Sequence, residues 1–192
     1  MKKLIILLSV FNALVASESF AQKKSFEITI IQDSVTIPNG EHEIVLQKKP
    51  FKIQIALQGL EGVYLFAAFK DSIYKIDIQQ EIPGFKEIPS MSMAEESFNP
   101  DHELIINNDG WAYWFYTKKE NWHRFDTGIV IAGKKITGTK SLKQFYFIEG
   151  EQKLMVEEVS MPLYLFFFSA KQNKKFNLET ELQRYKIKIN WQ

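Results

Sequence analysis

The chain has 192 residues, a formal net charge of +1 and no cysteine. That length fits one domain or at most two small ones. The lack of cysteine excludes disulfides, thiol chemistry and a lipid anchor attached through cysteine. The balanced charge, without a basic patch or a block of like charges, argues against nucleic acid and against an anionic membrane surface as partners. We therefore expect a fold that is held together by its apolar core.

Residues 1–21 have the pattern of a secretory signal peptide. Two lysines precede a mostly apolar run at 4–15, and Ser19 and Ala21 are small residues at the positions that a signal peptidase reads. The apolar run is about a dozen residues long, too short to span a hydrocarbon layer of roughly 30 Å. We expect cleavage after Ala21 and export of a formally neutral chain, 22–192, to the periplasm or the medium, without membrane insertion.

Alternation of apolar and polar residues dominates the mature chain. This period-two pattern predicts antiparallel strands with one face on a core and one face in water. Clear alternation runs through 26–30, 51–58, 74–78 and 185–191, and further strand-like runs lie at 43–47, 103–107, 129–132, 143–148 and 153–158. Many short strands separated by turn residues predict one all-β domain, an antiparallel β-sandwich of jelly-roll or immunoglobulin-like kind, with a closed calycin-like barrel as the alternative.

Turn and loop sequences suggest how these strands are joined. Residues 59–62, Gly-Leu-Glu-Gly, predict a four-residue hairpin loop that joins 51–58 to 63–69. Residues 82–100 contain three prolines and no alternation, so we expect a long crossover loop there. A single helical turn is expected after Ser92, where Glu95 completes a capping-box spacing, and another near 177–183.

Two predicted strands are apolar on both faces, which an ordinary sandwich strand is not. They are 63–69, with the sequence V-Y-L-F-A-A-F, and 163–168, with the sequence L-Y-L-F-F-F. Their second face needs a covering loop, the far wall of a barrel or a partner protein. The loop at 82–100 is the candidate within the chain.

Motifs of catalysis and cofactor binding are missing from the sequence. It has no G-x-S-x-G elbow, no H-E-x-x-H, no P-loop and no G-x-G-x-x-G. The three histidines, His42, His102 and His123, are best interpreted as surface residues at strand ends, without a metal site or a cofactor. A carboxylate pair for glycoside hydrolysis can be drawn from several acids, but their spacing selects none of them. These acids are Glu103, Asp109, Glu120 and Asp126.

The sequence W-A-Y-W-F-Y-T-K-K-E-N-W-H-R-F-D at 111–126 gathers three of the four tryptophans. We interpret it as an aromatic hairpin in which Trp114 faces Phe125 and Tyr113 faces Asp126. Burial of an unpaired arginine and aspartate would be costly, so the face that carries them is expected to be the wetter one. Trp114 and Phe125 then belong to the core. Flat aromatic side chains beside hydrogen-bonding groups suit a sugar ring or a protein anchor, although aromatic pairs also stabilise ordinary sheets. The candidate binding residues are Trp111, Tyr113, Trp122, Arg124 and Asp126.

Three functions are compatible with this sequence. The one that we favour is a non-enzymatic exported binding or accessory domain that acts through protein or glycan contacts. The first alternative is a carbohydrate-active or other hydrolase, which requires Asp126, His123 or His102 to line a common cleft. The second is a carrier of a small apolar ligand, which requires a cavity between Leu65, Phe69, Phe166 and Phe168.

Overall fold

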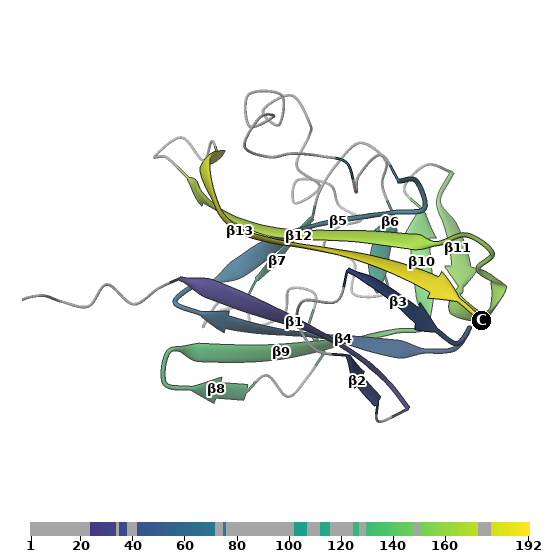
Figure 1. Ribbon diagram of the computed structural model, residues 1–192, viewed down its shortest axis with the longest axis horizontal. Helices are drawn as coiled ribbons and strands as arrows, with labels where there is room; N and C mark the ends of the chain where they lie inside the picture. The colour runs from purple at the N-terminus through teal and green to yellow at the C-terminus, as the bar shows by residue number, and fades with distance from the viewer. Residues whose placement is uncertain are drawn as a thin grey trace, which may run out of the picture.

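The computed structural model describes an all-β protein with three open sheets (Figure 1). The described residues are 24–33, 35–37, 42–71, 75, 102–106, 112–115, 125–126, 130–147, 150–172 and 178–192, with the backbone alone described for 112–115, 172 and 178–182. The predicted signal peptide, the loop at 82–100 and the helical turn after Ser92 lie outside them. Within the described part, no helix is long and apolar enough to cross a membrane.

Two five-stranded sheets form the body of the molecule. Sheet 1 has the order β2-β1-β4-β9-β8 and sheet 2 has the order β3-β13-β12-β5-β7. The strands of sheet 1 are β1 (Ser25–Gln32), β2 (Val35–Ile37), β4 (Phe51–Gln58), β8 (Val130–Ala132) and β9 (Lys135–Leu142). The strands of sheet 2 are β3 (Glu43–Leu46), β5 (Gly62–Ala68), β7 (Ala112–Phe115), β12 (Leu163–Gln172) and β13 (Leu178–Trp191).

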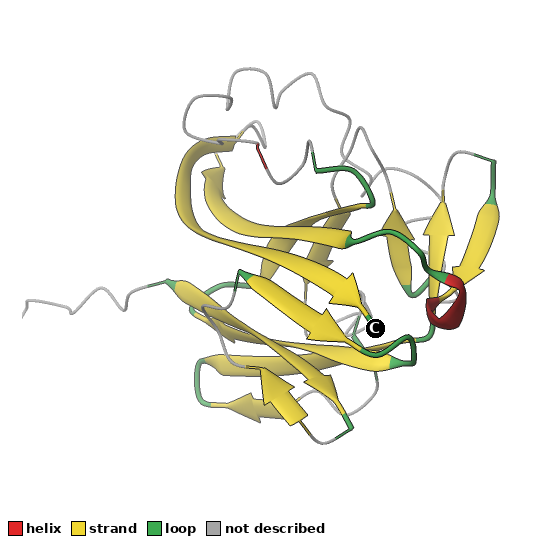
Figure 2. Ribbon diagram, turned by 45° about the vertical axis from the view of Figure 1, so that its right-hand side comes forward, coloured by secondary structure: helices red, strands yellow, loops and turns green. Residues whose placement is uncertain are grey.

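A third, smaller sheet lies at one end of these two layers (Figure 1). Sheet 3 has the order β11-β10-β6 and consists of β6 (Leu104–Ile106), β10 (Gln144–Phe147) and β11 (Gln152–Met155). Figure 2 shows the 3-10 helix η3 (Val156–Glu158) in red directly after β11. Phe69, just after β5, packs edge-on against Phe145 and stacks on Phe147, which joins sheet 3 to the core.

The core lies between the two layers, as the alternation predicts. Phe26, Ile28 and Ile30 of β1 are each 1% exposed, and the polar residues between them are half-buried or exposed. β4 shows the same alternation, and it pairs with β1 in register from Lys52 to Gln58. One core cluster contains inward residues of β1, β4, β5, β12 and β13. Burial of these side chains contributes about 1.5–3 kcal/mol each.

Two buried or half-buried glutamines tie the two layers together through backbone groups. At one end of β1, Gln32 donates to the carbonyls of Gln47 and Lys49 and accepts from the amide of Gln47. At the other end, the Gln183 side chain accepts from the amide of Phe26 and donates to its carbonyl. Each amide side chain therefore satisfies main-chain groups that would otherwise be unpaired between the sheets.

Several connections differ from the prediction. Residues 59–62 do not form a hairpin loop, because both edges of β4 are occupied by β1 and β9, and the chain passes instead to β5 in the other sheet. Two strand pairs, β3 with β13 and β6 with β10, are parallel rather than antiparallel. No sheet is closed among the described residues, which gives the barrel alternative no support.

Two predicted elements have a different structure. The strand expected at 153–158 ends at Met155, where the Glu158 carboxylate accepts the Met155 amide and a 3-10 turn buries Val156. The helical turn expected near 177–183 is wrong, because β13 begins at Leu178 and continues its ladder with β12.

Two strands, the short β2 and the long β9, are not among the predicted strands. The inward positions of β9 include Gly138, paired with Ile55, and Lys140, paired with Ile53. A glycine and a lysine at these positions hide the alternation that marks a strand in the sequence. A residue with a side chain would not fit at position 138, because the ring of Phe125 fills the space that the side chain would take. A Cβ on Gly138 would lie 2.3 Å from the Cδ1 atom of Phe125.

Candidate functional site

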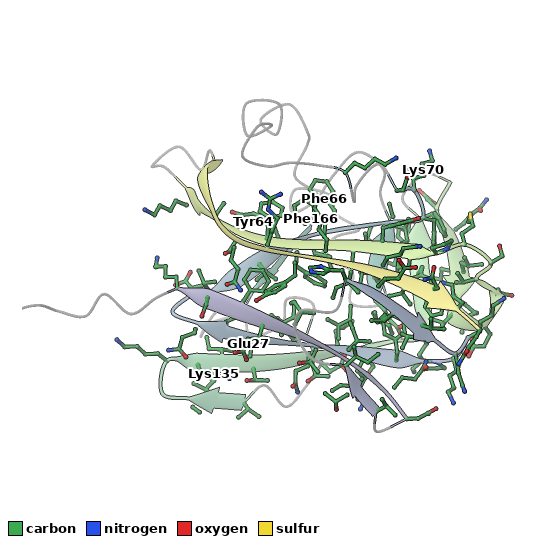
Figure 3. The ribbon with its side chains drawn as sticks, in the orientation of Figure 1. Glu27, Tyr64, Phe66, Lys70, Lys135 and Phe166 are labelled. Carbon is green, nitrogen blue, oxygen red and sulfur yellow. The ribbon has the colours of Figure 1, made fainter. Side chains whose placement is uncertain are left out.

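The two strands that are apolar on both faces lie side by side at the centre of sheet 2. β5 and β12 are antiparallel partners, with Phe66 opposite Phe166 and Tyr64 opposite Phe168. Val63, Leu65, Leu165 and other inward residues of these strands belong to the core between the layers. The intervening residues point to the outer face of the sheet, where Figure 3 shows Tyr64, Phe66 and Phe166 on the side away from sheet 1.

These outer residues form a continuous aromatic layer, consisting of Tyr64, Phe66, Phe166 and Phe168. The Tyr64 and Phe168 rings stack at 4.8 Å, and Phe66 stacks on both Phe166 and Phe168 at 6.3 Å. The ammonium of Lys186 lies 4.9 Å from the centre of the Phe166 ring, a cation–π contact. All four aromatic residues are at most 4% exposed, so the layer is a second core and not an open surface.

This arrangement places the four residues predicted to bound one apolar cavity on two different faces of sheet 2. Leu65 belongs to the core between the two layers, and Phe69 packs against that core. Phe166 and Phe168 lie on the opposite face of the same sheet. The prediction of a single cavity bounded by these four residues is therefore wrong. The loop at 82–100, which we expect to cover the aromatic layer, lies outside the described residues.

The five candidate binding residues are only partly described. Trp111, Trp122 and Arg124 lie outside the described residues. Tyr113 is in β7, where its backbone pairs with Tyr64 of the aromatic layer. Asp126 is described in full and lies beside β9, a strand of the other sheet. The structure thus does not test these residues as one site.

The hairpin register predicted for 111–126 is wrong. β7 pairs with β5, whereas Phe125 and Asp126 are outside any strand ladder. The amide of Asp126 donates to the carbonyl of Thr139 on β9 at 2.6 Å. Trp114 therefore does not face Phe125 across a ladder, and Tyr113 does not face Asp126. The prediction that Phe125 is a core residue is confirmed, since it is 8% exposed and its ring lies against Gly138.

Two of the four acids suggested for hydrolysis, Glu103 and Asp126, serve the backbone of one corner, where β9 passes into β10, whereas Asp109 and Glu120 lie outside the described residues. The Asp126 carboxylate accepts hydrogen bonds from the amide and the hydroxyl of Ser141, at 2.8 and 2.7 Å, and lies 3.8 Å from the Lys140 ammonium. The Glu103 carboxylate accepts the amides of Lys143 and Gln144. Both acids thus satisfy amides that the corner leaves without a strand partner. This geometry holds a turn in place.

The histidines do not form a reactive cluster with these acids in the described part of the chain. His102 is buried and stacks flat on Tyr146 at 3.5 Å, so its expected surface position is wrong. His42 is exposed at the start of β3, and its carbonyl accepts the Lys188 amide. His123 lies outside the described residues. Among the residues that are described, no group of three or more His, Cys, Asp or Glu is placed to hold a metal ion.

An open groove lies at the end of sheet 1, where β1 ends and β4 begins. Residues 31–33, residues 50–52, Ser141 and Lys143 line this end groove, which has a volume of about 440 Å³. Pockets for small ligands typically measure about 300–1,000 Å³, so the end groove has room for one or two sugar rings or a few amino-acid side chains. Ile31 and Pro50 provide its accessible apolar surface, and polar groups stand around them.

The charges around the end groove are unevenly paired. The carboxylate of Asp33 forms an ion pair with Lys49, and the carboxylate of Asp126 accepts a hydrogen bond from Ser141 and forms an ion pair with Lys140. The ammonium groups of Lys52 and Lys143, by contrast, pair with no carboxylate among the described residues. Both lysines are exposed. Within the described part of the chain, two cations without a fixed partner thus stand at the rim of a groove whose neighbouring acids are already engaged.

Asp33 shapes one wall of the end groove through its backbone. Its φ of 49° lies in the left-handed region, which aspartate tolerates better than most residues with a side chain. This conformation turns the chain at the end of β1, and the side chain of Asp33 forms an ion pair with Lys49.

No pattern in the sequence indicates the end groove. Two of its residues, Ser141 and Lys143, come from the end of β9 and the residue after it, and β9 is not among the predicted strands. Ser141 nevertheless connects the groove to one predicted site residue, because its hydroxyl donates to Asp126. Comparison with known proteins adds no further guide to function: no family model, no curated protein and no solved structure matches this chain.

Proposed function

We propose that the chain is an exported, non-enzymatic binding domain that acts through protein or glycan contacts. The observation that carries this proposal is the end groove, an open site with an apolar floor and a polar rim on the exposed face of sheet 1. Binding sites of this type combine apolar surface with a few hydrogen-bonding groups that fix orientation. Export rests on the signal-peptide pattern of residues 1–21.

The fold assumed in this proposal is an antiparallel β-sandwich of jelly-roll or immunoglobulin-like kind. Its support is the pair of five-stranded sheets that enclose one core cluster, with most strand pairs antiparallel. Such sandwiches use their loops and exposed sheet faces for recognition and leave the core intact.

The aromatic stretch remains part of the proposed binding surface. Asp126 accepts a hydrogen bond from Ser141 of the end groove, and Trp122 and Arg124 precede Asp126 closely in the sequence. Trp111 and Tyr113 complete the predicted set, and Tyr113 pairs with Tyr64 in sheet 2. Alanine at Trp122 and Arg124 tests whether this stretch contributes to binding in addition to the groove.

The test of the proposal fills the groove with a larger side chain. Ile31→Trp places an indole where the half-buried isoleucine lines the groove, and Ile131→Trp makes the same change at an exposed position on β8 of the same sheet. Both variants and the wild-type mature chain are titrated calorimetrically against a panel of glycans and peptides. We expect Ile31→Trp to weaken binding of the panel's ligand while Ile131→Trp leaves it unchanged.

Circular dichroism checks that both variants keep the fold. Equal binding by all three proteins would exclude the end groove as the site, and binding by none of them to any panel member would remove the support for a glycan- or peptide-binding domain.

A further inference from the structure

The strongest unassigned feature of the molecule is the unequal pairing of charges at the end groove. Each acid near the groove already has partners: Asp33 has Lys49, and Asp126 has Ser141 and Lys140. A further ligand gains little from these acids. Lys52 and Lys143 are exposed cations from two different strand ends and have no carboxylate partner in the described part of the chain.

We infer that the end groove binds a carboxylate-bearing glycan, with Lys52 and Lys143 as the groups that recognise the acid; this ligand class rests on the proposed binding function of the groove. Lys52 lies on β4 and Lys143 directly follows the neighbouring strand β9, and both residues line the same groove. An ammonium group bonded to a carboxylate forms a charge-assisted hydrogen bond, which is stronger than a neutral one.

The floor and the remaining polar group favour a sugar over a peptide as the occupant. Ile31 and Pro50 offer a small apolar surface, which suits the C–H face of a pyranose ring. The Ser141 hydroxyl donates to Asp126, so its oxygen still has acceptor capacity for a sugar hydroxyl. An extended peptide would instead use free main-chain groups of an edge strand, whereas the groove lies over β1, β4 and β9, and β1 and β4 are paired on both edges.

The experiment compares three classes of ligand on four proteins. The ligands are uronate trisaccharides (galacturonate, mannuronate and a glucuronate-containing one), the methyl esters of the same trisaccharides, and hexaglutamate. The proteins are the wild-type mature chain, Lys52→Met with Lys143→Met, the control Lys153→Met with Lys171→Met, and Ile31→Trp. The control pair removes the same two charges from exposed lysines on β11 and β12, outside the groove.

We expect at least one uronate to bind the wild-type chain and the control pair equally. The groove pair should bind it about tenfold or more weakly, since each lost charge-assisted bond contributes to affinity. The methyl ester should bind the wild-type chain as weakly as the uronate binds the groove pair. Added salt should weaken the binding of the uronate and leave the binding of the ester unchanged, because salt screens the attraction between exposed charges.

Other outcomes separate this inference from the proposed function. Equal binding of ester and acid overturns the role of the carboxylate but keeps the groove as a site, provided that Ile31→Trp still blocks it. If hexaglutamate binds and none of the uronate trisaccharides does, the occupant is an acidic peptide, and the inference of a glycan ligand is overturned. Binding of neutral panel ligands alone, blocked by Ile31→Trp, also overturns the inference and leaves the function standing. Uronate binding that neither Ile31→Trp nor the groove pair affects refutes both.

Discussion

Gly138→Ala is the substitution whose effect the structure defines most sharply. An added Cβ would lie 2.3, 2.6 and 2.7 Å from three atoms of the Phe125 ring. Carbon atoms in contact are roughly 3.5–4.0 Å apart, so the ring would have to move by about 1 Å or more. The ring has little room to do so, because Phe125 is 8% exposed and belongs to the core cluster.

The expected cost is about 1–3 kcal/mol, as for other overpacked cores. For a chain of this size, each kcal/mol lowers the melting temperature by about 2–4 °C. Urea unfolding followed by circular dichroism measures the loss in free energy, and a thermal scan gives the shift in melting temperature.

A double-mutant cycle with Phe125→Ala tests the cause of the effect. Phe125→Ala alone should cost about 3–5 kcal/mol, the usual loss for a buried phenylalanine. In that background the steric conflict is gone, and alanine is favoured over glycine in a strand by roughly 0.5–1 kcal/mol. We therefore expect Gly138→Ala to stabilise the Phe125→Ala protein. The same destabilisation in both backgrounds would refute the packing of Phe125 on Gly138.

Three other features of the chain lead to further predictions. Gln32→Ala leaves main-chain groups of Gln47 and Lys49 unpaired and should lower the free energy of unfolding by about 1–3 kcal/mol, as measured by urea unfolding. Gln58→Ala is the control and should lower it less. Equal losses in the two variants would contradict the stabilising role of the Gln32 hydrogen bonds. The hydrogen bond from Lys188 lowers the pKa of Glu43, so its contribution to stability should be present near neutral pH and vanish as pH falls through the lowered pKa. The difference in stability between wild type and Glu43→Gln, measured from pH 7 to pH 3, should shrink with acidity, and a constant difference would contradict this linkage. Mass spectrometry of the exported protein should show cleavage after Ala21, and an intact leader on the secreted chain would refute it.

The sequence predicted those strands in which every inward position carries a large apolar residue. Alternation located β1, β4 and the final part of β13, because their inward residues are all large and apolar. It failed for β9, where Phe125 fills the position that a side chain of Gly138 would take. A residue from outside the ladder thus supplies the packing, and no local pattern records such a contact.

Connections were harder to predict than strands. The sequence 59–62 has the composition of a hairpin turn, but the strand before it is already paired on both edges. Whether a turn joins neighbours or crosses between layers depends on which strands occupy the free edges, and this is decided by the whole sheet.

The two apolar strands show the limit of prediction most clearly. Their double-sided character correctly indicated that both faces of β5 and of most of β12 are buried. It did not indicate that the strands would be neighbours, which turns two separate apolar faces into one aromatic layer. The site could be predicted even less, because the end groove depends on the meeting of β1, β4 and β9, and alternation does not reveal the last of these.

The central claim, that the end groove is the binding surface, is tested most directly by mapping backbone amide shifts of the isotope-labelled mature chain during titration with the panel ligand that binds it. We predict the largest shifts at Ile31, Lys52, Ser141 and Lys143, with little change at Ile131 on β8. Shifts concentrated at Trp122 and Arg124, with the groove unaffected, would contradict the claim and identify the aromatic stretch as the site.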